Sequence, residues 1–551
     1  MSTTIEREAA VVAPELMLGD EAVALGAIDA GITGAYAYPG TPSTEIFARV
    51  IAEAEHEGHV TAHWCANEKS SMEAALGCSL AGRRALVTMK HVGLNVAADP
   101  FMNAPLLGLG GGLVIAVADD PGMHSSQNEQ DTRYYGDFAR ALVLEPATAQ
   151  EAYAMTVEAF ELSERFRRPV LLRLVTRLCH ERAGVVRGAR REQNAVAKAT
   201  PPQDWTLLPV HARRLWKGIL EQEPEVQAWS AGYERTVRKA GTGKRGVLTA
   251  GIARRYYLEV ADELDVELPH LHLAAYPIPE ELLRDFCAGL DELLVVEEGY
   301  PFLETRLRGV LGTRVAVRGK TTGHLPPDGE LTPGLVGRAL GLPTHEGLEL
   351  PQAMPVPPRP PQLCQGCVHS EAYAALDMAL AGYGERHENV VAGDIGCYTL
   401  GALSPYRGID SCVCMGASIG MAKGAADAGL KPAVGVIGDS TFLHSGVTPL
   451  MDAASHDTDM VVLILDNETV AMTGGQPTVL RTSRLKPVVL GVGCDPDHVH
   501  EVHAKPKGVA DTAALIKKEI EHPGLSVIII IRECVQTARQ KKAEKAKEER
   551  R

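Results

Sequence analysis

The chain has 551 residues, of which 45% are hydrophobic, 54 are glycine and 34 are proline, and its formal net charge is −15. A chain of this length holds about three or four domains with large apolar cores, and its acidic balance disfavours nucleic acids as partners. No apolar run is long enough to cross a membrane and the N-terminus has no apolar signal core, so we expect a cytoplasmic protein without a membrane anchor. The 11 scattered cysteines are then expected to be core thiols, metal ligands or redox groups rather than disulfides.

Alternating strand and helix patterns divide the chain into three α/β regions. The first contains apolar strands such as "RRALVTMKHVG" that end in polar loops, separated by helical stretches such as "AQEAYAMTVEAFELSERF". Strands that alternate with helices predict doubly wound parallel sheets. The predicted divisions are 1–184 (first α/β domain), 185–243 (charged linker or peripheral segment), 244–345 (second α/β domain), 346–362 (extended Pro-rich linker), 363–535 (third α/β domain) and 536–551 (a charged tail, predicted to be a solvated, frayed helix).

Polar residues follow two neighbouring strand-like runs in "VIGDSTFLHSGVTPLMDAASHDTDMVVLILDNE", residues 436–468. In open parallel sheets, ligands bind beyond the carboxyl ends of the strands, where Asp439 and Asn467 are both predicted to lie. A carboxylate and an amide oxygen directed at one point suit Mg²⁺, which completes its coordination with phosphate oxygens. The alternative is an ordinary acid at a strand end and an ordinary asparagine in a turn.

This spacing resembles the thiamine diphosphate motif, a Gly-Asp-x followed by an asparagine about one helix and one strand later. The resemblance implies that Mg²⁺ is held by Asp439, Asn467 and the backbone carbonyl of Thr469. Asp466 stands where the motif usually has another asparagine, a departure that leaves the ligand position intact. The remaining residues implied at the diphosphate are Gly438, Ser440 and Thr441, and His444 further along the same predicted loop is a candidate for the reacting centre.

A thiamine enzyme also needs a carboxylate that shares a proton with N1′ of the aminopyrimidine, a general acid–base relay. That carboxylate normally comes from a separate α/β domain. In the first domain Glu68 is predicted at the start of a helix after the short strand "HVTAHWC". Glutamates at helix starts are also common as favourable partners of the helix dipole.

Several stretches together carry a more specific resemblance. They are "YPGTPSTEIF", "ALVTMKHVGLNVAADP", "VADDPGMHSSQNEQDTRYYG", "VVEEGYPFLE", "LCQGCVHS", "GDIGCYTLG", "CMGASIGMAKGAA", "GDSTFLHSG" and "DNETVAMTGGQPT". The chain resembles the large subunits of indolepyruvate ferredoxin oxidoreductases, in the 2-oxoacid:ferredoxin oxidoreductase superfamily, over nearly its whole length. The resemblance implies a pyrimidine-binding domain, a transketolase C-terminal-like domain and a diphosphate-binding domain, in that order.

The resemblance also implies roles for residues of the first domain. Glu68 becomes the carboxylate at N1′, and Lys90 and His91, with catalytic roles, contact the substrate carboxylate or carbonyl. His124 and Arg133 are weaker candidates for contacts with substrate or coenzyme A. The residues implied to face the cofactor and substrate are Tyr38, Pro39, Gly40, Thr41 and Pro42 in one turn, and Asn95 after the next strand.

Four cysteines stand at places where the superfamily's diphosphate domains hold a 4Fe-4S cluster: Cys364, Cys367, Cys397 and Cys534. Four thiolates are the standard ligand set of that cluster. By themselves the residues leave zinc binding, redox chemistry or buried thiols open. Cys412 and Cys414 are ranked below these four, because "SCVCMGASIG" is typical of a packed strand-to-helix turn.

The resemblance predicts oxidative decarboxylation of a 2-oxoacid, an arylpyruvate such as indolepyruvate, to the acyl-CoA and CO₂. Thiamine diphosphate, Mg²⁺ and the cluster are the implied cofactors, and coenzyme A is the cosubstrate. The implied partners are a smaller subunit of the same oxidoreductase and ferredoxin or another electron carrier, with a homodimer inside a larger heteromer. The sequence has no cysteine after Cys534, so electrons are expected to leave through a partner; the alternatives are a non-oxidative thiamine-dependent decarboxylase or carboligase and a non-catalytic subunit.

Overall fold

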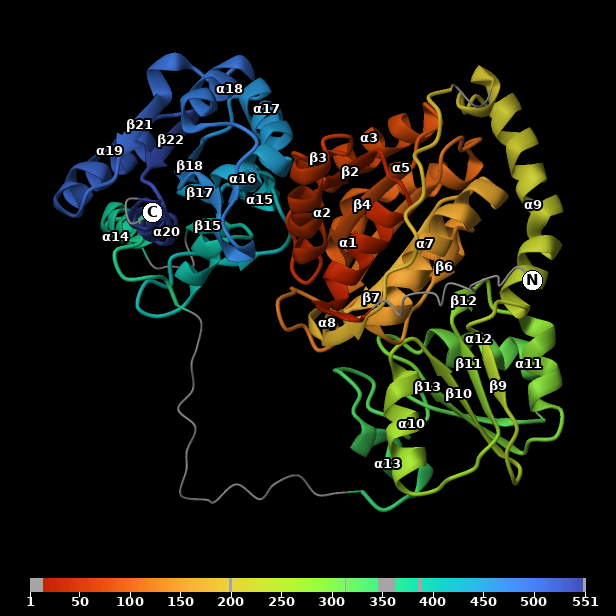
Figure 1. The fold of residues 1–551 in the computed structure, drawn as a ribbon. Helices are drawn as coiled ribbons and strands as arrows, with labels where there is room; N and C mark the ends of the chain where they lie inside the picture. The colour runs from red at the N-terminus through yellow and green to blue at the C-terminus, as the bar shows by residue number, and fades with distance from the viewer. Residues whose placement is uncertain (1–12, 198–200, 313, 345–361, 385–388, 549–551) are drawn as a thin grey trace. The chain divides into compact units, whose positions relative to one another are not determined.

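Three sheets of five, six and seven strands carry the fold (Figure 1). The structure is a computed structural model that describes residues 13–197, 201–312, 314–344, 362–384 and 389–548. The chain divides into two compact units, unit 1 (residues 1–349) and unit 2 (residues 350–551). The predicted Pro-rich linker lies outside the described residues except for Gln362. Within the described residues, no helix combines the length and the apolar character that a membrane span requires.

The first sheet of unit 1 is doubly wound, as the alternating pattern predicts. Its strands pair in parallel, apart from the short edge strand β12, which runs antiparallel to β6. Every residue of β5 is buried. Its adjacent residues Val114 and Ile115 point to opposite faces of the sheet and belong to different hydrophobic cores, so helices cover both faces. The strand order is β12 (Ala275–Tyr276), β6 (Leu142–Leu144), β7 (Val170–Val175), β5 (Leu113–Asp119), β4 (Ala85–Lys90), β2 (Gly34–Ala37) and β3 (Thr61–Trp64).

The helices that connect these strands position the candidate residues of unit 1. They are α1 (Gly19–Asp29), α2 (Thr44–Glu57), α3 (Glu68–Leu80), α4 (His91–Val96), α5 (Ala98–Asn103), α6 (Arg133–Ala139), α7 (Ala149–Phe166) and α8 (Thr176–His180). A small antiparallel pair joins β1 (Glu15–Leu18) to β8 (Arg182–Val185).

The second sheet of unit 1 is smaller. Its strand order is β14 (Ala316–Arg318), β13 (Glu292–Val296), β10 (Arg245–Ala250), β11 (His270–Leu273) and β9 (Val237–Lys239), with β9 antiparallel to β11. Its helices are α10 (Ala253–Glu263), α11 (Glu280–Cys287), α12 (Phe302–Leu311) and α13 (Pro333–Leu340). Because β12 completes the first sheet, the predicted first and second domains are parts of one compact unit.

The segment 185–243, predicted as a linker or peripheral segment, contains the long helix α9 (Pro209–Ala231), which belongs to unit 1. Ile219 and Val226 on this helix are buried, and the Ile219 carbonyl accepts a hydrogen bond of 2.9 Å from Arg168 Nη2. The sequence pattern did not predict this helix, because its residues are polar on average and only a narrow apolar stripe contacts the core.

The sheet of unit 2 is parallel throughout. Both faces are covered, because Val461 and Val462 of β18 belong to different cores. The charged tail forms α20 (Val535–Glu548), as predicted. The strand order is β16 (Ser411–Cys412), β15 (Val390–Gly393), β17 (Ala433–Gly438), β18 (Met460–Asp466), β22 (Leu525–Ile531) and β21 (Val499–His503); the main helices are α14 (Val368–Leu380), α15 (Ala417–Asp427), α17 (Val447–Ser455), α18 (Leu485–Gly491) and α19 (Val509–Glu521).

Candidate functional site

In unit 1, the Glu68 carboxylate is held in a buried position at the first turn of α3. Asn67 caps this helix by accepting a hydrogen bond of 2.8 Å from the Ser70 amide, and Glu68 is only 5% exposed. The side chain lies against Gly93 of α4, since a Cβ at Gly93 would be 2.8 Å from the Glu68 Cδ. The carboxylate therefore occupies space that any larger residue at position 93 would need.

Lys90 ends β4 beside the turn that contains Gly40 and Thr41. Its ammonium group donates hydrogen bonds to the carbonyl and hydroxyl of Ser125, at 2.6 and 3.1 Å, and lies 3.9 Å from Asp120 Oδ2. Burial lowers the pKa of Lys90 to about 8, although Asp120 opposes the shift. The Ser125 hydroxyl also donates to the Thr41 carbonyl at 3.3 Å, and a Cβ at Gly40 would be 3.2 Å from the Lys90 Cβ. The structure thus brings the predicted turn and Lys90 together.

His91 follows directly, at the start of α4, and is fully buried. Its Nε2 lies 3.2 Å from the Asn128 carbonyl, while Nδ1 has no hydrogen-bond partner among the described residues. Burial lowers the pKa of His91, so the ring is neutral at neutral pH. Asn95, one turn later, is exposed and accepts a 2.7 Å hydrogen bond from the Tyr135 hydroxyl.

The structure corrects the prediction for Arg133. This guanidinium is 1% exposed and is engaged with Asp131, with Glu297 at 2.9 Å and with the Glu298 carbonyl at 2.9 Å. A guanidinium this deeply buried and already paired with acids of unit 1 is not presented to a substrate. His124 is exposed and pairs with Glu330 at 3.3 Å, so its predicted contact stays a prediction.

In unit 2, two buried carboxylates meet at the ends of the neighbouring strands β17 and β18. Asp439 and Asp466 are 4% and 1% exposed, and the Oδ2 atom of each has no hydrogen-bond partner among the described residues. Burial and then the neighbouring Asp466 raise the pKa of Asp439 well above its ordinary value. Adjacent buried carboxylates with free oxygens are the donor set that a divalent cation neutralises, so these residues fit Mg²⁺.

Asn467 is oriented by two hydrogen bonds. Its Oδ1 accepts from the Thr469 amide at 3.0 Å, and its Nδ2 lies 3.4 Å from Nε2 of His369. His369, at the start of α14, is 1% exposed, and burial lowers its pKa to about 4, so the neutral ring accepts this hydrogen bond. The prediction from sequence missed His369, whose only signal was its place two residues after Cys367.

A third acid that the prediction missed is Asp394, which directly follows β15. It accepts hydrogen bonds from the backbone amides of Gly416 at 2.9 Å and Ser418 at 3.1 Å, which fixes the start of α15. Asp394 directly follows a buried strand, as Asp439 does, so the same reasoning from polar residues at strand ends would have identified it.

The segment after Asp439 is a helix, which corrects the predicted loop for Thr441 and His444. The helix runs through α16 (Asp439–Thr441), a π-helical turn η5 (Phe442–Gly446) and α17. Both side chains are buried; Thr441 donates a 2.9 Å hydrogen bond to the Ile395 carbonyl and His444 Nδ1 lies 2.6 Å from the Ser445 hydroxyl. π-helical turns inside α-helices occur frequently at functional sites.

The other three predicted cluster cysteines lie near enough to Cys397 in unit 2 to affect its thiol electrostatically. Burial raises the pKa of the Cys397 thiol to about 12, with further contributions from Cys367, Cys534 and Cys364. The Cys534 amide donates a 3.2 Å hydrogen bond to the Asn467 carbonyl, so the backbone of Cys534 lies next to Asn467. Cys412 interacts with another set of groups, Thr399, Asp394 and Cys414, outside this group.

Two family models match the chain: "Pyruvate flavodoxin/ferredoxin oxidoreductase, thiamine diP-bdg" over residues 25–205, and "Thiamine pyrophosphate enzyme, C-terminal TPP binding domain" over residues 394–530. Indolepyruvate oxidoreductase subunit IorA of Archaeoglobus fulgidus is 38% identical over 94% of this chain and 86% of its own length. The IorA subunits of Methanothermobacter marburgensis and Thermococcus kodakarensis are both 36% identical, over 93% and 94% of this chain and 85% of their own lengths. The chain therefore belongs to the indolepyruvate oxidoreductase subunit IorA family, within the thiamine diphosphate-dependent 2-oxoacid:ferredoxin oxidoreductases.

Proposed function

We propose that this chain carries out the oxidative decarboxylation of an arylpyruvate, most simply indolepyruvate, to the acyl-CoA and CO₂. Electrons pass through a 4Fe-4S cluster to ferredoxin or a partner subunit. The names of its relatives support the substrate class, and their designation as subunits supports a smaller partner subunit.

When bound, thiamine diphosphate supplies a nucleophile for the keto carbon and an electron sink for the decarboxylated substrate. Glu68 shares a proton with N1′ of its pyrimidine, and burial of the carboxylate beside Gly93 keeps water from competing for that proton. The turn Tyr38–Thr41, which packs against Lys90 at Gly40, would contact the coenzyme.

Lys90 and His91 bind the substrate. The Lys90 ammonium, charged at neutral pH, pairs with the substrate carboxylate. In neutral His91 the Nε2–H group donates to the Asn128 carbonyl, so Nδ1 is the acceptor for a donor group of the bound substrate or coenzyme. Asn95 is exposed, and we assign it a contact with the coenzyme or the substrate at the edge of the proposed site.

Unit 2 holds the diphosphate end. Asp439, Asn467 and the carbonyl of Thr469 would hold Mg²⁺, and Gly438, Ser440 and Thr441, at the start of the helix that begins with α16, would contact the phosphates. His444, in the π-helical turn η5, is the residue of unit 2 that we assign to the reacting centre.

Oxidative over non-oxidative chemistry is supported by the proximity of Cys364, Cys367 and Cys534 to Cys397, with the backbone of Cys534 beside Asn467. When bound, a 4Fe-4S cluster accepts single electrons, and four thiolates are its usual ligands. A non-oxidative decarboxylase would have no use for such a group at this position.

The test is the iron and acid-labile sulfide content of the anaerobically purified complex, with its visible spectrum. We expect about four irons per chain. Cys397→Ser should lose the cluster, whereas the matched control Cys414→Ser, an exposed cysteine outside the group, should retain it. An iron-free complex that releases aldehyde from phenylpyruvate would contradict the proposal and favour the non-oxidative alternative.

A further inference from the structure

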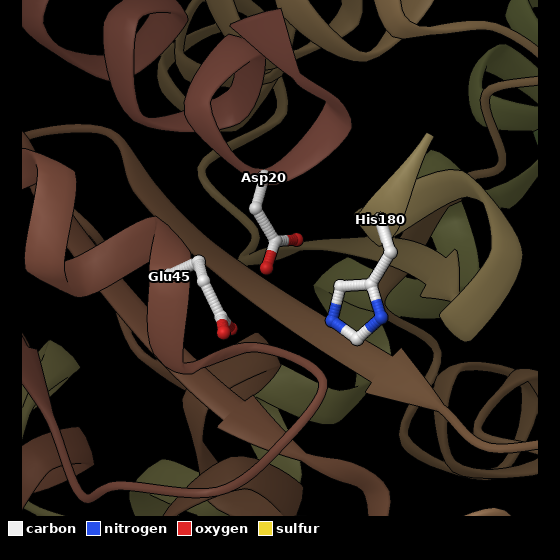
Figure 2. A group of neighbouring side chains, drawn as sticks. All are labelled: Asp20, Glu45 and His180. Carbon is white, nitrogen blue, oxygen red and sulfur yellow. The ribbon is translucent and has the colours of Figure 1, made fainter. Parts of the chain in front are cut away.

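Three side chains of unit 1 that have no part in the proposed reaction point toward one another (Figure 2). Asp20 lies in the first turn of α1, Glu45 in the first turn of α2, and His180 at the end of α8. One ligand atom of each lies within 4.8 Å of the others. Residues this far apart in sequence meet only in the folded unit.

Asp20 is the least ordinary member of this group. Its side chain is 0% exposed, and neither carboxylate oxygen accepts a regular hydrogen bond from the described residues. Burial raises its pKa well above the ordinary value, Glu45 adds to the shift, and the weakly donating thiol of Cys179 opposes it. Glu45 Oε2 also has no hydrogen-bond partner among the described residues. A buried carboxylate without donors is costly unless a cation or a proton compensates it.

We propose that Asp20, Glu45 and His180 bind a divalent transition cation of the zinc type. Zinc binds carboxylate oxygens and imidazole nitrogens, so the three residues offer three of its four ligands, and the cation would neutralise the two carboxylates. In a tetrahedral zinc site with bonds of about 2.0–2.2 Å, ligand atoms stand roughly 3.4 Å apart. The group needs only a small side-chain movement to reach that spacing, and His180 is exposed and free to turn toward the ion.

The backbone around the group is fixed. The Gly19 amide donates a 3.1 Å hydrogen bond to the Glu181 carbonyl, and a Cβ at Gly19 would be 2.9 Å from the Leu178 carbonyl carbon. The start of α1 therefore packs closely against α8, so Asp20 and His180 face each other without any change in the backbone.

The site would act on the candidate active site through α8. Thr176, the first residue of α8, donates a 2.8 Å hydrogen bond to Asp120, whose other oxygen accepts from the Ser125 amide at 2.9 Å. Ser125 in turn binds Lys90. A cation that joins α1, α2 and α8 would stabilise this support of Lys90, so we assign it a structural role.

The experiment measures zinc bound per chain by the purified full-length protein after chelator treatment, incubation with Zn²⁺ alone and gel filtration. Thiolates are good zinc ligands and unit 2 contains several cysteines, so the measured quantity is the difference between the parent and each variant. We expect Asp20→Asn, Glu45→Gln and His180→Ala each to bind about one zinc fewer per chain. Zn²⁺ should also raise the melting temperature of the parent more than that of the variants.

The matched controls are His56→Ala and Glu55→Gln, exposed residues on the same helix as Glu45, which should bind as much zinc as the parent. His180→Ala keeps the test decisive if Asp20→Asn fails to fold, because the His180 side chain is exposed. Equal zinc content in the parent and His180→Ala would overturn the proposal; it would mean that a proton and the helix N-termini alone compensate the two acids.

Discussion

At the scale of single residues, the candidate site depends on side chains whose surroundings leave them little freedom. Glu68 fills the space over Gly93, and Lys90 is tied to Ser125. Such packing pre-orients the groups before any ligand arrives, which reduces the entropy lost on binding. Each group can therefore be tested by a substitution that keeps its shape and changes only its chemistry.

Glu68→Gln keeps the size of the side chain but cannot exchange a proton with the pyrimidine. We expect turnover of indolepyruvate to fall by about 10²–10⁴-fold, the usual contribution of a positioned acid or base, while thiamine diphosphate still binds. Steady-state rates with a low-potential dye and calorimetric titration of the coenzyme separate the two effects. Glu73→Gln, an exposed residue of the same helix, is the control, and unchanged turnover in Glu68→Gln would refute the assigned role.

Lys90 gives the site a pH dependence. Its pKa is about 8, so the ammonium that pairs with a substrate carboxylate is present below this pH and is lost as the pH rises through it. We expect kcat/KM to fall above pH 8, since this parameter reports groups of the free enzyme.

The variant Lys90→Arg tests this assignment, because arginine stays charged through the whole range. Its kcat/KM should be lower overall but should not fall near pH 8. A descending limb at the same pH in parent and variant would show that another group is responsible.

At the scale of secondary-structure elements, the candidate polar residues lie at strand ends, and glycines allow the neighbouring elements to pack closely around them. Gly416 has φ = 90°, donates its amide to Asp394 and stands against Ser445, whose Cβ would be 2.6 Å from a new Cβ. It therefore joins β16, α15 and the π-helical turn η5 that contains His444.

Gly416→Ala should destabilise unit 2 by about 1–3 kcal/mol from backbone strain alone, because the left-handed conformation disfavours a side chain. Thermal unfolding should show a lower melting temperature by several degrees, at about 2–4 °C for each kcal/mol in a unit of this size. Gly420→Ala is the control: a Cβ there meets no atom within 4 Å, and alanine should stabilise the helix slightly. Equal melting temperatures would contradict this account.

The elements also show where prediction from sequence succeeded and why it stopped. Strand-end polarity identified Asp439 and Asn467 because it follows from the geometry of a parallel sheet. It did not predict β12, a two-residue edge strand that pairs only through its backbone, or the π-helical turn η5, which sequence patterns do not distinguish from a loop. His369 and the group Asp20, Glu45 and His180 depend on tertiary contacts that no periodicity reports.

At the scale of the whole molecule, the two halves of the proposed coenzyme site belong to different units, since Glu68 lies in unit 1 and Asp439 in unit 2. In the homodimer that the resemblance implies, we propose that one site combines Glu68 of one copy with Asp439 of the other. A chain with a substitution at Glu68 would then still contribute an intact Asp439 to a site, and a chain with a substitution at Asp439 would still contribute an intact Glu68.

Co-expression of Glu68→Gln and Asp439→Asn chains tests this arrangement. If sites form between copies of a twofold dimer, each mixed dimer contains one wholly intact site and one doubly defective site. Random pairing makes half of the dimers mixed, so we expect about a quarter of the parent activity. If each site forms within a single chain, every site keeps one defect and activity stays at the level of the single variants. Glu68→Gln co-expressed with Glu68→Ala is the control: both defects fall in the same half-site, so neither arrangement can restore activity.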